Sequence, residues 1–545
     1  MSDTPDRFDA VIVGAGFAGM YMLHRLREAG FSARVYEAGD GVGGTWYWNR
    51  YPGARCDVES LEYQYSFSDE LQREWNWSER YAQQPEILDY AEHVADRFDL
   101  RRDIQFQTRV ETATYDEDTS RWNVAAGPSG GESTRVSAQF LIMATGCLSK
   151  PKFPEIAGRE SFQGEAYHTG LWPHEGVDFA GRGVGVIGTG SSAIQSIPRI
   201  AEQASHVTVF QRTPNFSIPA NQQPLAPEAI ATYKDEFQAL RRKALTHPFG
   251  FITDQSTLSV FDVDDDERNR TLNASWQAGG FKFLGDFADW PVDEPANEKM
   301  ADFVRDKIAD TVSDPQVAAT LQPRSYPLGT KRICVDTDYF QTYNRDNVRL
   351  VDLNQTPIEA ITTAGLRTSA EEFAFDTLVY ATGFDAMTGA ILAVDIRGRG
   401  GESLREKWAA GPRTYLGLCV AGFPNLFTIT GPGSPSVLSN MMVAIEQHVD
   451  WIHDCVVSLR AQELGSIEAA PEAEAEWVEH VAAVGDATLF PKANSWYLGA
   501  NVPGKPRVFL PYIGLGVYKE KCDAVAANEY EGFVLQPRSS VTVGS

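Results

Sequence analysis

The stretch that decides the fold occupies residues 8–37 and reads FDAVIVGAGFAGMYMLHRLREAGFSARVYE. Its apolar start, residues 8–13, predicts a strand that runs directly into glycines. Residues 20–28 have the apolar spacing of a helix, and residues 33–36 predict a second strand. This strand–helix–strand order predicts a nucleotide-binding unit of the Rossmann type.

Three glycines, Gly14, Gly16 and Gly19, occupy the turn between the first strand and the helix. Glycine suits this turn because a pyrophosphate must approach the backbone and the helix must pack closely on the strand. The helix N-terminus adds free N–H groups and a positive dipole end. Glu37 follows the second strand, 37 − 14 = 23 residues after the first glycine, where a carboxylate accepts hydrogen bonds from a ribose diol. We expect these residues to bind FAD or NAD; a purely structural turn is the alternative.

The same order of elements recurs later in the chain. Residues 184–187 predict a strand, glycines begin at Gly188, a helical stretch runs through Ala204, and residues 207–210 predict the next strand. The turn reads GTGSSA and ends at Ala193. The chain therefore carries two nucleotide-binding units, far enough apart for each to belong to its own domain.

The second unit differs from the first at the end of its last strand. In place of an acid it has Gln211, Arg212 and Thr213, and Arg212 lies 212 − 188 = 24 residues after the first glycine. A guanidinium in this slot pairs with a 2′-phosphate and has no partner on NAD. The pattern predicts NADP as the second nucleotide, and a solvated surface arginine is the alternative.

Length and composition limit the fold class and the partners. The chain has 545 residues with 43% hydrophobic and 22% charged content, which is ordinary for a globular protein but too long for one domain of usual size. The formal net charge of −26 argues against nucleic acid and anionic membranes as partners and favours a small neutral substrate. We expect an α/β fold of two Rossmann-like dinucleotide-binding domains, for FAD and NADP, with a helical insertion.

The cysteines and the N-terminus indicate the compartment. Six cysteines are scattered without CxxC or Cys/His ligand spacing, so neither a disulfide framework nor a metal site is predicted. The N-terminus lacks a basic n-region, and no run approaches the ~18 apolar residues of a spanning helix. We expect a soluble, cytoplasmic protein that is a monomer or a weak homo-oligomer.

The middle and the end of the chain suggest how the domains divide. Charged helical sequence between residues 227 and 317 surrounds an acidic stretch, DVDDDE at 262–267, which we expect to be a loop. The segments LVYATG, NLFTIT and FVL predict strands that complete sheets begun earlier, before a flexible tail over 537–545. The predicted domains are an FAD-binding domain of residues 1–150 and 388–545, an NADP-binding domain of residues 151–225 and 326–387, and a helical insertion of residues 226–325.

Two dinucleotide sites on one chain are typical of a flavoprotein that takes hydride from a nicotinamide. Disulfide reductases of this kind need a redox-active cysteine pair near the flavin. The segment GGTWYWNRYPGARC contains only Cys56. We therefore expect oxygen to be the electron acceptor.

Two further segments carry a family resemblance. FQGEAYHTGLWP resembles the FxGxxxHxxxWP fingerprint of type I Baeyer-Villiger monooxygenases, and residues 43–57 are similar to that family's second signature. The related N-hydroxylating and flavin-containing monooxygenases have Tyr or Phe where this chain has Trp. The resemblance covers nearly the whole chain and is greatest to the phenylacetone and steroid monooxygenase branch. The fingerprint residues are Phe162, Gly164, His168, Trp172 and Pro173.

The resemblance implies an activity. FAD, NADPH and O2 would form a C4a-peroxyflavin that converts ketones to esters or lactones, with sulfides as additional substrates. Arg332, in GTKRI, matches the arginine that stabilises the peroxide, and Asp57 matches the carboxylate that orients it. An arginine suits this role because it stays charged and donates several hydrogen bonds. Without the resemblance, Lys331 and Arg332 would be read as surface charge.

The resemblance also implies cofactor and substrate contacts. Trp496 would lie on a mobile loop that folds over NADP, although alone it reads as a core aromatic. His168 would sit on the linker between domains and couple their movement rather than transfer protons. For FAD the implied residues, beside those of the first glycine unit, are Gly44, Thr45, Trp46, Trp48, Asp57, Tyr63, Val110 and Met441. For NADP they are Arg55, Gly188, Thr189, Gly190, Ser191, Ser192, Gln195, Arg212, Thr213, Lys331, Arg332 and Trp496. For the ketone pocket they are Ser436, Val437 and Leu438.

Two other functions remain open from the sequence. A heteroatom monooxygenase would oxidise amines or sulfides through a hydroperoxide electrophile. A non-catalytic flavin redox sensor would show no substrate-stimulated consumption of NADPH. An assay of NADPH oxidation with a ketone panel and product mass separates all three.

Overall fold

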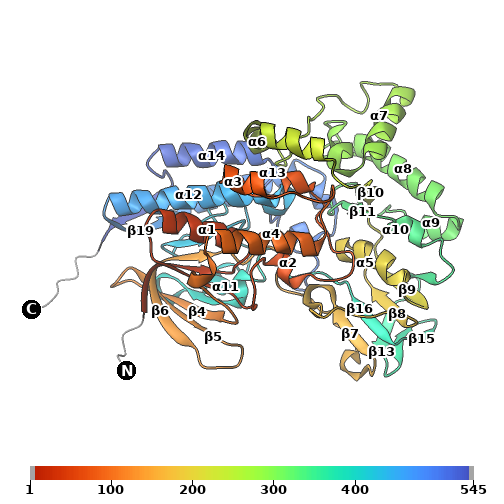
Figure 1. Ribbon diagram of the computed structural model, residues 1–545, viewed down its shortest axis with the longest axis horizontal. Helices are drawn as coiled ribbons and strands as arrows, with labels where there is room; N and C mark the ends of the chain where they lie inside the picture. Colours follow the sequence, from red (N-terminus) through yellow and green to blue (C-terminus); the bar gives the residue numbers. More distant parts are fainter. Residues whose placement is uncertain (1–5, 539–545) are drawn as a thin grey trace, which may run out of the picture.

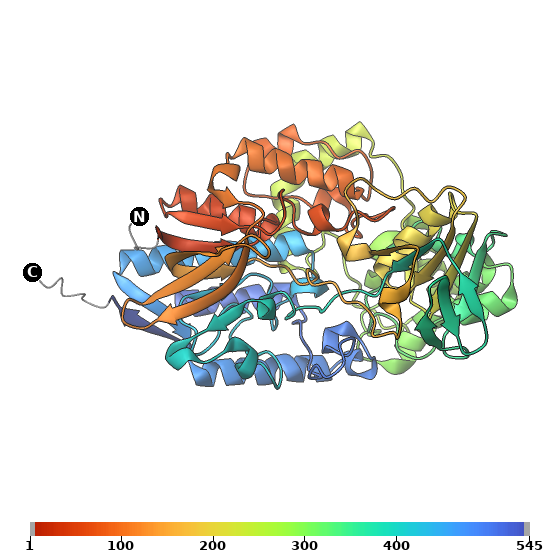
Figure 2. The same ribbon diagram turned by 90° about the horizontal axis from the view of Figure 1, so that it is seen from below.

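The computed structural model describes residues 6–538. Figures 1 and 2 show two lobes side by side, each built around its own sheet. The first and last parts of the chain together form one lobe, on the left in both views, and the middle of the chain forms the other.

The first lobe contains an eight-stranded sheet in the order β17-β4-β5-β6-β1-β2-β3, with β18 paired to β6. β1 lies parallel to both β2 and β6, and helix α1 (Phe17–Glu28) follows β1. The predicted first unit is confirmed, with the helix beginning three residues earlier than expected because it starts directly after Gly16. The strands are β1 (Asp6–Val13), β2 (Ala33–Tyr36), β3 (Ile104–Gln105), β4 (Arg109–Asp116), β5 (Arg121–Gly127), β6 (Thr134–Met143), β17 (Asp395–Arg397) and β18 (Leu426–Thr428).

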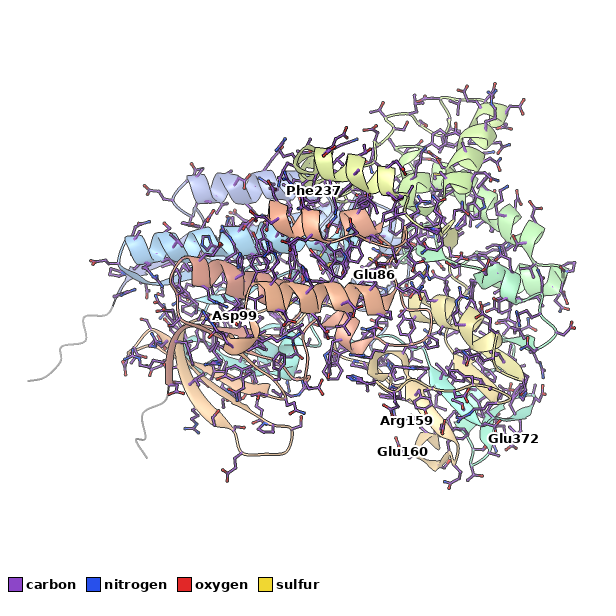
Figure 3. All side chains as sticks on the ribbon, viewed as in Figure 1. Glu86, Asp99, Arg159, Glu160, Phe237 and Glu372 are labelled. Atoms are coloured by element: carbon purple, nitrogen blue, oxygen red, sulfur yellow. The ribbon has the colours of Figure 1, made fainter. Side chains whose placement is uncertain are left out.

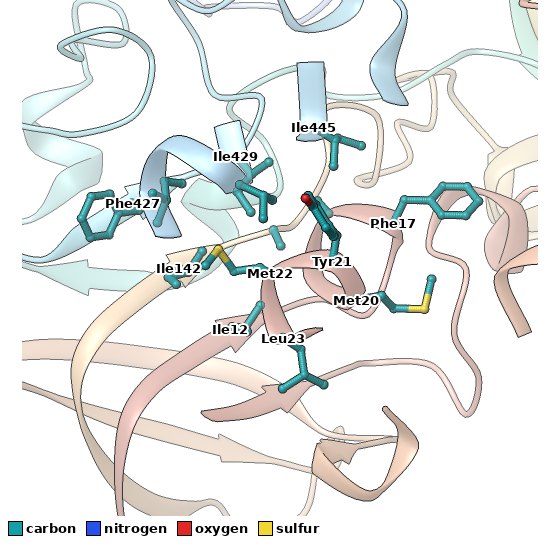
Figure 4. Packing of buried hydrophobic residues seen from close by; sticks show 14 of the residues in the cluster. Ile12, Phe17, Met20, Tyr21, Met22, Leu23, Ile142, Phe427, Ile429 and Ile445 are labelled. Carbon is teal, nitrogen blue, oxygen red and sulfur yellow. The ribbon is translucent and has the colours of Figure 1, made fainter. Parts of the chain in front are cut away.

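The core of this lobe joins segments from both ends of the chain. Figure 4 shows Ile12 of β1 and Met22 of α1 packed with Ile142 of β6, Phe427 of β18 and Ile445 of helix α12 (Met441–Ala461). Each of these side chains is at most 6% exposed. Burial of one such side chain contributes about 1.5–3 kcal/mol, so the late segments are integral to the first sheet.

The second lobe contains a five-stranded sheet in the order β12-β9-β8-β16-β7, in which every neighbouring pair is parallel. Helix α5 (Ser191–Ala201) connects β8 to β9, so the second predicted unit is also confirmed. The strands are β7 (Glu165–His168), β8 (Gly183–Ile187), β9 (His206–Gln211), β12 (Val348–Asp352) and β16 (Thr377–Tyr380).

Of the three late strands, two complete earlier sheets as predicted. The first three residues of LVYATG belong to β16, and the central residues of NLFTIT form β18. The prediction was wrong for FVL, which forms β20 (Phe533–Pro537) and pairs with β19 (Leu464–Ala469) in a separate two-stranded sheet. The sequence shows strand character but not the partner, which here lies directly after α12. The expected tail begins inside β20 at residue 537, and residues 539–545 lie outside the described part of the chain.

A helical segment separates β10 (Ser217–Pro219) from β11 (Cys334–Asp336), which pair with each other. It contains α6 (Pro227–Thr246), α7 (Asp265–Ala278), α8 (Glu294–Thr311) and α9 (Pro315–Leu321). α6 packs on α12 and α14 (Leu515–Ala527) of the first lobe, whereas α7 to α9 lie beside the second (Figure 1). The expected boundaries of the insertion and of the two domains stay a prediction.

The acidic stretch 262–267 is only partly the loop that we expected. The Asp264 side chain accepts a hydrogen bond from the backbone N–H of Glu267 at 2.8 Å and so caps α7, which begins at Asp265. Aspartate favours this position because it satisfies a free N–H group and complements the helix dipole. The acidic residues therefore start a helix.

The remaining elements complete the two lobes. They include α2 (Thr45–Trp48), α3 (Asp69–Glu74), α4 (Gln84–Arg97), α10 (Tyr339–Thr342), α11 (Leu404–Lys407), α13 (Pro471–Asp486), β13 (Ile358–Ile361), β14 (Gly365–Thr368) and β15 (Glu372–Ala374). Between residues 6 and 538 no helix is long and apolar enough to cross a membrane. Figure 3 shows charged side chains such as Glu160 and Glu372 at the periphery of the second lobe.

Candidate active site

The first glycine turn has no room for side chains. A Cβ atom at Gly14, where φ is +102°, would lie 2.7 Å from the carbonyl oxygen of Ala144. At Gly19 it would lie 1.9 Å from the carbonyl oxygen of Gly14. At Gly44 it would lie 2.9 Å from Cα of Gly16, so two glycine loops face each other without side chains between them. This bare backbone at a helix N-terminus suits a pyrophosphate.

Glu37 is buried directly beside this turn. Its carboxylate accepts hydrogen bonds from the backbone N–H groups of Ala15 and Gly39, each at 2.8 Å. Each carboxylate oxygen can accept a second bond, so the arrangement remains compatible with a ribose diol. Glu37 therefore also holds the glycine turn, which the sequence did not indicate.

The other residues expected at FAD come from α2, β4, α12 and the residue that follows the short turn at 60–62, all in the first lobe. Thr45, Trp46 and Trp48 form α2, directly after Gly44. The Trp46 indole N–H donates to the Tyr63 hydroxyl at 3.2 Å. The last two lie apart in the sequence: Val110 is buried on β4, and Met441 begins α12.

Arg332 and Asp57 are brought together from opposite lobes, 275 residues apart. Arg332 Nη2 donates to both carboxylate oxygens of Asp57 at 2.8 Å, and Nε donates to Oδ2 at 3.1 Å. Both side chains are only about a quarter exposed, at 25% and 22%. Arg332 Nη1 also donates to the carbonyl oxygen of Val437 at 3.0 Å. One guanidinium therefore contacts the other lobe and the expected ketone pocket.

The surroundings of Arg332 keep it charged. Burial by itself would lower the pKa of the guanidinium, but Asp57 and then Tyr497 outweigh it and raise that pKa above its usual value. The Phe281 ring lies 5.2 Å from the guanidinium carbon, a cation–π distance. Sequence reasoning missed Tyr497 and Phe281. Tyr497 could have been suspected as the neighbour of Trp496, but nothing in the insertion marks Phe281.

The expected ketone pocket residues form one short helical turn, Ser436–Leu438. Ser436 has a φ of +44°, a conformation rarely adopted by residues other than glycine. Its hydroxyl lies 3.0 Å from the thiol of Cys147 and 3.7 Å from the sulfur of Met387. These two sulfur residues support the turn and were not identified from the sequence.

The second glycine turn lies at the carboxyl end of β8. A Cβ atom at Gly188 would lie 2.4 Å from the carbonyl oxygen of Ala381, whereas one at Gly190 would meet nothing within 4 Å. The Thr189 hydroxyl donates to the carbonyl oxygen of Thr213 at 2.8 Å. Gly190 and Ser191 are exposed, so the start of α5 is accessible.

Arg212 and Lys331 form a positively charged pair beside this turn. Arg212 is exposed at the end of β9. Burial and the charge of Arg212 lower the pKa of Lys331 to about 8. Within residues 6–538, neither side chain has a carboxylate oxygen within 4.0 Å of its nitrogen atoms. Two neighbouring cations without an acidic partner fit the 2′-phosphate of NADP.

Gln195 of α5 connects this site to the first lobe. It accepts from the Tyr51 hydroxyl at 2.8 Å and donates to the carbonyl oxygen of Arg55 at 3.0 Å. Arg55 Nη1 is buried and has no hydrogen-bond partner among the described residues. A buried donor without a partner is unfavourable, so it fits a site that a ligand completes.

Comparison with known proteins identifies the family. A family model described as pyridine nucleotide-disulphide oxidoreductase matches residues 11–268. The chain is 42% identical to a Baeyer-Villiger monooxygenase of Pseudooceanicola batsensis, over 97% of this chain and 96% of that protein. The chain belongs to the type I Baeyer-Villiger monooxygenases. It is also 41% identical to a phenazine N-monooxygenase of Lysobacter antibioticus, over 98% of each chain.

A solved structure supports the assignment to this family. The chain matches an oxidised steroid monooxygenase bound to NADP with a TM-score of 0.92 and 50% identity, covering 97% of this chain and 99% of that one. This agrees with the expected branch of Baeyer-Villiger monooxygenases. The six cysteines are all free and buried.

The Baeyer-Villiger fingerprint, residues 162–173, begins before β7 and ends after it. His168 ends this edge strand, so the expectation that it sits on the linker was wrong. Its Nδ1 accepts from the backbone N–H of Gly170 at 3.0 Å. Its Nε2 lies 3.3 Å from the carbonyl oxygen of Lys152, in the segment that connects β6 to β7. Because Nδ1 accepts, Nε2 carries the proton. Burial lowers the pKa of His168, which suits a neutral, structural histidine.

The remaining fingerprint residues have packing roles. Trp172 is buried in the core of the second lobe, 6.2 Å from the ring of Phe179. A Cβ atom at Gly164 would lie 2.5 Å from the ring of Phe162, so glycine is needed there. Pro173 follows Trp172 and is half-buried.

Trp496 starts a short turn, Trp496–Leu498. Its ring lies 4.3 Å from that of Tyr497, and it packs against a cluster that includes Cys147, Met387 and Val437. In this position it adjoins the pocket turn that contacts Arg332. The mobility expected for this segment stays a prediction.

Proposed function

We propose that this chain is a Baeyer-Villiger monooxygenase that uses FAD, NADPH and O2 to insert one oxygen atom next to a ketone carbonyl. One observation carries the proposal: Arg332 of the second lobe is fixed by Asp57 of the first lobe and contacts the pocket turn at Val437. The first glycine unit and Glu37 would hold FAD. The second unit, with Arg212 and Lys331, would hold NADPH.

FAD, once reduced by NADPH, would supply the activation of O2. Arg332 would stabilise negative charge on the oxygen that is transferred and on the tetrahedral adduct of the ketone. Two of its nitrogen atoms are directed at Asp57, which fixes the plane of the guanidinium. Nη1 has two hydrogens, and Val437 accepts one of them, so a donor remains for the reacting oxygen.

The segment around Trp496 would exclude water from this site. Tyr497 is 2% exposed, and burial raises its pKa to about 12, so it stays neutral beside Arg332. A neutral, apolar cover strengthens the interaction of Arg332 with a developing negative charge.

Heteroatom oxidation is a second candidate, because one full-length relative is a phenazine N-monooxygenase. Such a reaction needs a protonated, electrophilic oxygen donor. Arg332 is a permanent cation and favours the anionic, nucleophilic form instead, so we favour ketones over amines and sulfides.

One experiment tests these alternatives. NADPH oxidation by the purified, FAD-containing protein would be measured with linear, cyclic and aromatic ketones, with an amine and a sulfide as comparisons. We expect ketone-stimulated NADPH consumption and an ester or lactone one oxygen atom heavier than its ketone. Products formed only from the amine or sulfide would favour heteroatom oxidation, and the absence of any stimulation would favour a redox sensor.

We also propose that the protein is cytoplasmic. The six buried free thiols support a reducing cytoplasm. We propose a monomer or weak homo-oligomer, which sedimentation at several concentrations would test. A stable oligomer at the lowest concentration would contradict it.

A further inference from the structure

Glu62 is a buried carboxylate where the first lobe meets the helical segment. It ends the short turn Ser60–Glu62 and is only 8% exposed. Its Oε2 accepts a hydrogen bond from the backbone N–H of Ile252 at 2.9 Å, and its backbone carbonyl oxygen accepts from the side chain of Asn440 at 2.9 Å. Asn440 caps α12 and lies two positions beyond the pocket turn. Glu62 therefore joins the segment after α6 to the end of the pocket turn.

The segment after α6, residues 247–252, has further contacts with the first lobe. The carbonyl oxygen of Phe249 accepts from the backbone N–H of Asn440 at 2.9 Å. The carbonyl oxygen of Pro248 accepts from the backbone N–H of Leu515, the first residue of α14, at 2.8 Å. The segment is thus anchored on the first lobe, although it lies in sequence between β10 and β11.

Phe251, in this segment, meets a ring that packs on the other lobe. Its ring lies 5.5 Å from that of Phe281, and the two planes are tilted by 37°. Phe251 packs against the core of the first lobe, and Phe281 packs against that of the second. The guanidinium of Arg332 lies 5.2 Å from the Phe281 ring, and both rings are half-buried. The two rings form an aromatic wall beside Arg332.

The position of Phe251 depends on the backbone groups on either side of it. The carbonyl oxygen of Phe249 is bonded to α12, and the N–H of Ile252 is bonded to Glu62. A backbone that is held on both sides has few conformations left, so the ring that it carries keeps one position. Loss of the Glu62 contact would free one of these two sides.

We propose that Glu62 is a positioning residue for ketone oxidation, which fixes the aromatic wall beside Arg332 and so determines the size of ketone that the site accepts. It acts through Phe251 and does not touch the reacting atoms. The inference rests on the proposed function, because it concerns the ketone that Arg332 would face. Glu62 is not among the residues that the family resemblance implied.

The charge of Glu62 provides a readout that packing alone would not give. Burial raises the pKa of its carboxyl group to about 7, and Glu59 acts in the same direction, whereas Arg241 and Lys243 oppose it. The titratable groups of its own turn and of the elements around it are Glu59, Tyr81, Tyr233, Arg241, Lys243, His247 and Glu446. The bond from Ile252 becomes charge-assisted, and therefore stronger, as the pH rises through about 7.

The test compares Glu62→Gln and Glu62→Ala with the unmodified enzyme, all containing FAD. Glu70→Gln is the control, because Glu70 is an exposed residue of α3. At saturating NADPH, kcat/KM would be measured for a small aliphatic ketone and for a bulky aromatic one. Both Glu62 variants should shift the ratio of these values toward the bulky ketone by about 3- to 10-fold, the effect of one hydrogen bond. In the unmodified enzyme the ratio should shift toward the small ketone as the pH rises through about 7, and Glu62→Gln should remove this shift.

Two further measurements show whether Glu62 acts through the wall. Phe251→Ala should change the same ratio, and adding Glu62→Ala to it should have no further effect, because residues that act through one contact are not additive. Hydrogen exchange followed by mass spectrometry should be faster at residues 249–252 in Glu62→Ala and unchanged in Glu70→Gln.

The outcomes separate this inference from the proposed function. An unchanged ratio in the Glu62 variants, additive effects in the double variant, or unchanged hydrogen exchange would each overturn the inference. If the unmodified enzyme oxidises neither ketone, the proposed function fails instead, and the exchange experiment still decides whether Glu62 holds this segment.

Discussion

At the scale of single residues, Arg332 connects three parts of the molecule. It contacts Asp57 of the first lobe, the carbonyl oxygen of Val437 in the pocket turn, and the ring of Phe281 in the helical segment. The orientation of its guanidinium is thus fixed before substrate arrives. Preorganised charge of this kind stabilises a transition state without reorganisation during the reaction.

Replacement of Arg332 tests which half of the cycle needs this cation. Arg332→Ala should abolish ester formation while flavin reduction by NADPH persists at a lower rate. Loss of one preorganised donor costs ~10²- to 10³-fold, and loss of a full charge more. Arg332→Lys should retain only part of the ester-forming activity, because an ammonium group cannot reproduce the bidentate contact with Asp57. Stopped-flow absorbance after mixing the oxidised variant with NADPH gives the rate of flavin reduction, and product analysis after mixing the reduced, NADP-bound variant with O2 and a ketone gives the ester yield. A normal ester yield from Arg332→Ala would refute the role.

Asp57 should matter to oxygenation but not to flavin retention. Asp57→Ala removes the partner that orients Arg332, so ketone oxidation should slow. FAD should stay bound, because the glycine turn and Glu37 would hold it. The ratio of FAD to protein and the ketone turnover rate measure the two effects separately. Unchanged turnover would show that the ion pair of Asp57 with Arg332 plays no part in oxygenation.

Arg212 should discriminate between the two nicotinamide cofactors. Arg212→Ala should raise KM for NADPH by about tenfold and leave KM for NADH nearly unchanged, since only NADPH has a 2′-phosphate.

Lys331 has a pKa lowered to about 8, so it loses its proton as the pH rises through that value. The preference for NADPH should therefore decline above pH 8. KM values for both cofactors across this range provide the check, and equal values in the unmodified enzyme would contradict the assignment.

At the scale of elements, the two glycine turns differ in how tightly they are packed. The third position of the first turn is Gly19, where a Cβ atom would lie 1.9 Å from a backbone oxygen. The corresponding residue of the second turn is Ala193, which is fully buried, so the second turn has room for a Cβ atom at this position. The helix–strand contact is therefore closer in the first unit.

Gly19→Ala should consequently disturb the first unit alone. The added methyl group meets backbone that cannot move aside, and overpacking of this kind costs about 1–3 kcal/mol or more. Gly190→Ala is a matched control, because a Cβ atom there meets nothing within 4 Å. Thermal release of FAD fluorescence should occur at lower temperature in Gly19→Ala only. Similar release temperatures for the two variants would contradict this account.

Local patterns predicted the strand–helix–strand units well, because each depends on residues adjacent in the sequence. Residues 33–36 form the predicted strand without change. Pairings over long distances were harder: nothing in FVL indicates that β20 joins β19 rather than the large sheet. Likewise, the family resemblance implied that His168 lies on a linker, whereas its position at a strand end depends on pairing with β16.

At the scale of the whole molecule, the site exists only where the lobes meet. Arg332 comes from one lobe and Asp57 from the other, and Gln195 joins α5 to Tyr51 and Arg55. The family resemblance identified Arg332 and Asp57 as site residues from the sequence alone. It gave no sign of Tyr497 or Phe281, whose importance depends on distances between remote segments.

Gln195→Ala should loosen the contact between the lobes. It removes the acceptor of Tyr51 and the donor to the carbonyl oxygen of Arg55, while the buried core of each lobe is untouched. We expect less ester formed per NADPH consumed, because the nicotinamide and flavin sites are held less firmly in register. Glu202→Gln, at the exposed end of the same helix, is the control. Equal yields per NADPH for both variants would rule out a coupling role for Gln195.

The eight-stranded sheet also determines the order in which the protein can mature on the ribosome. β6 emerges early, but its neighbour β18 and the covering helix α12 follow the entire second lobe in the chain. The five-stranded sheet of the second lobe is complete once β16 has emerged, whereas the sheet of the first lobe still lacks β17 and β18. A nascent chain thus has every strand of its middle sheet before every strand of its first sheet, and premature termination in the last quarter removes strands and helices from the lobe that was started first.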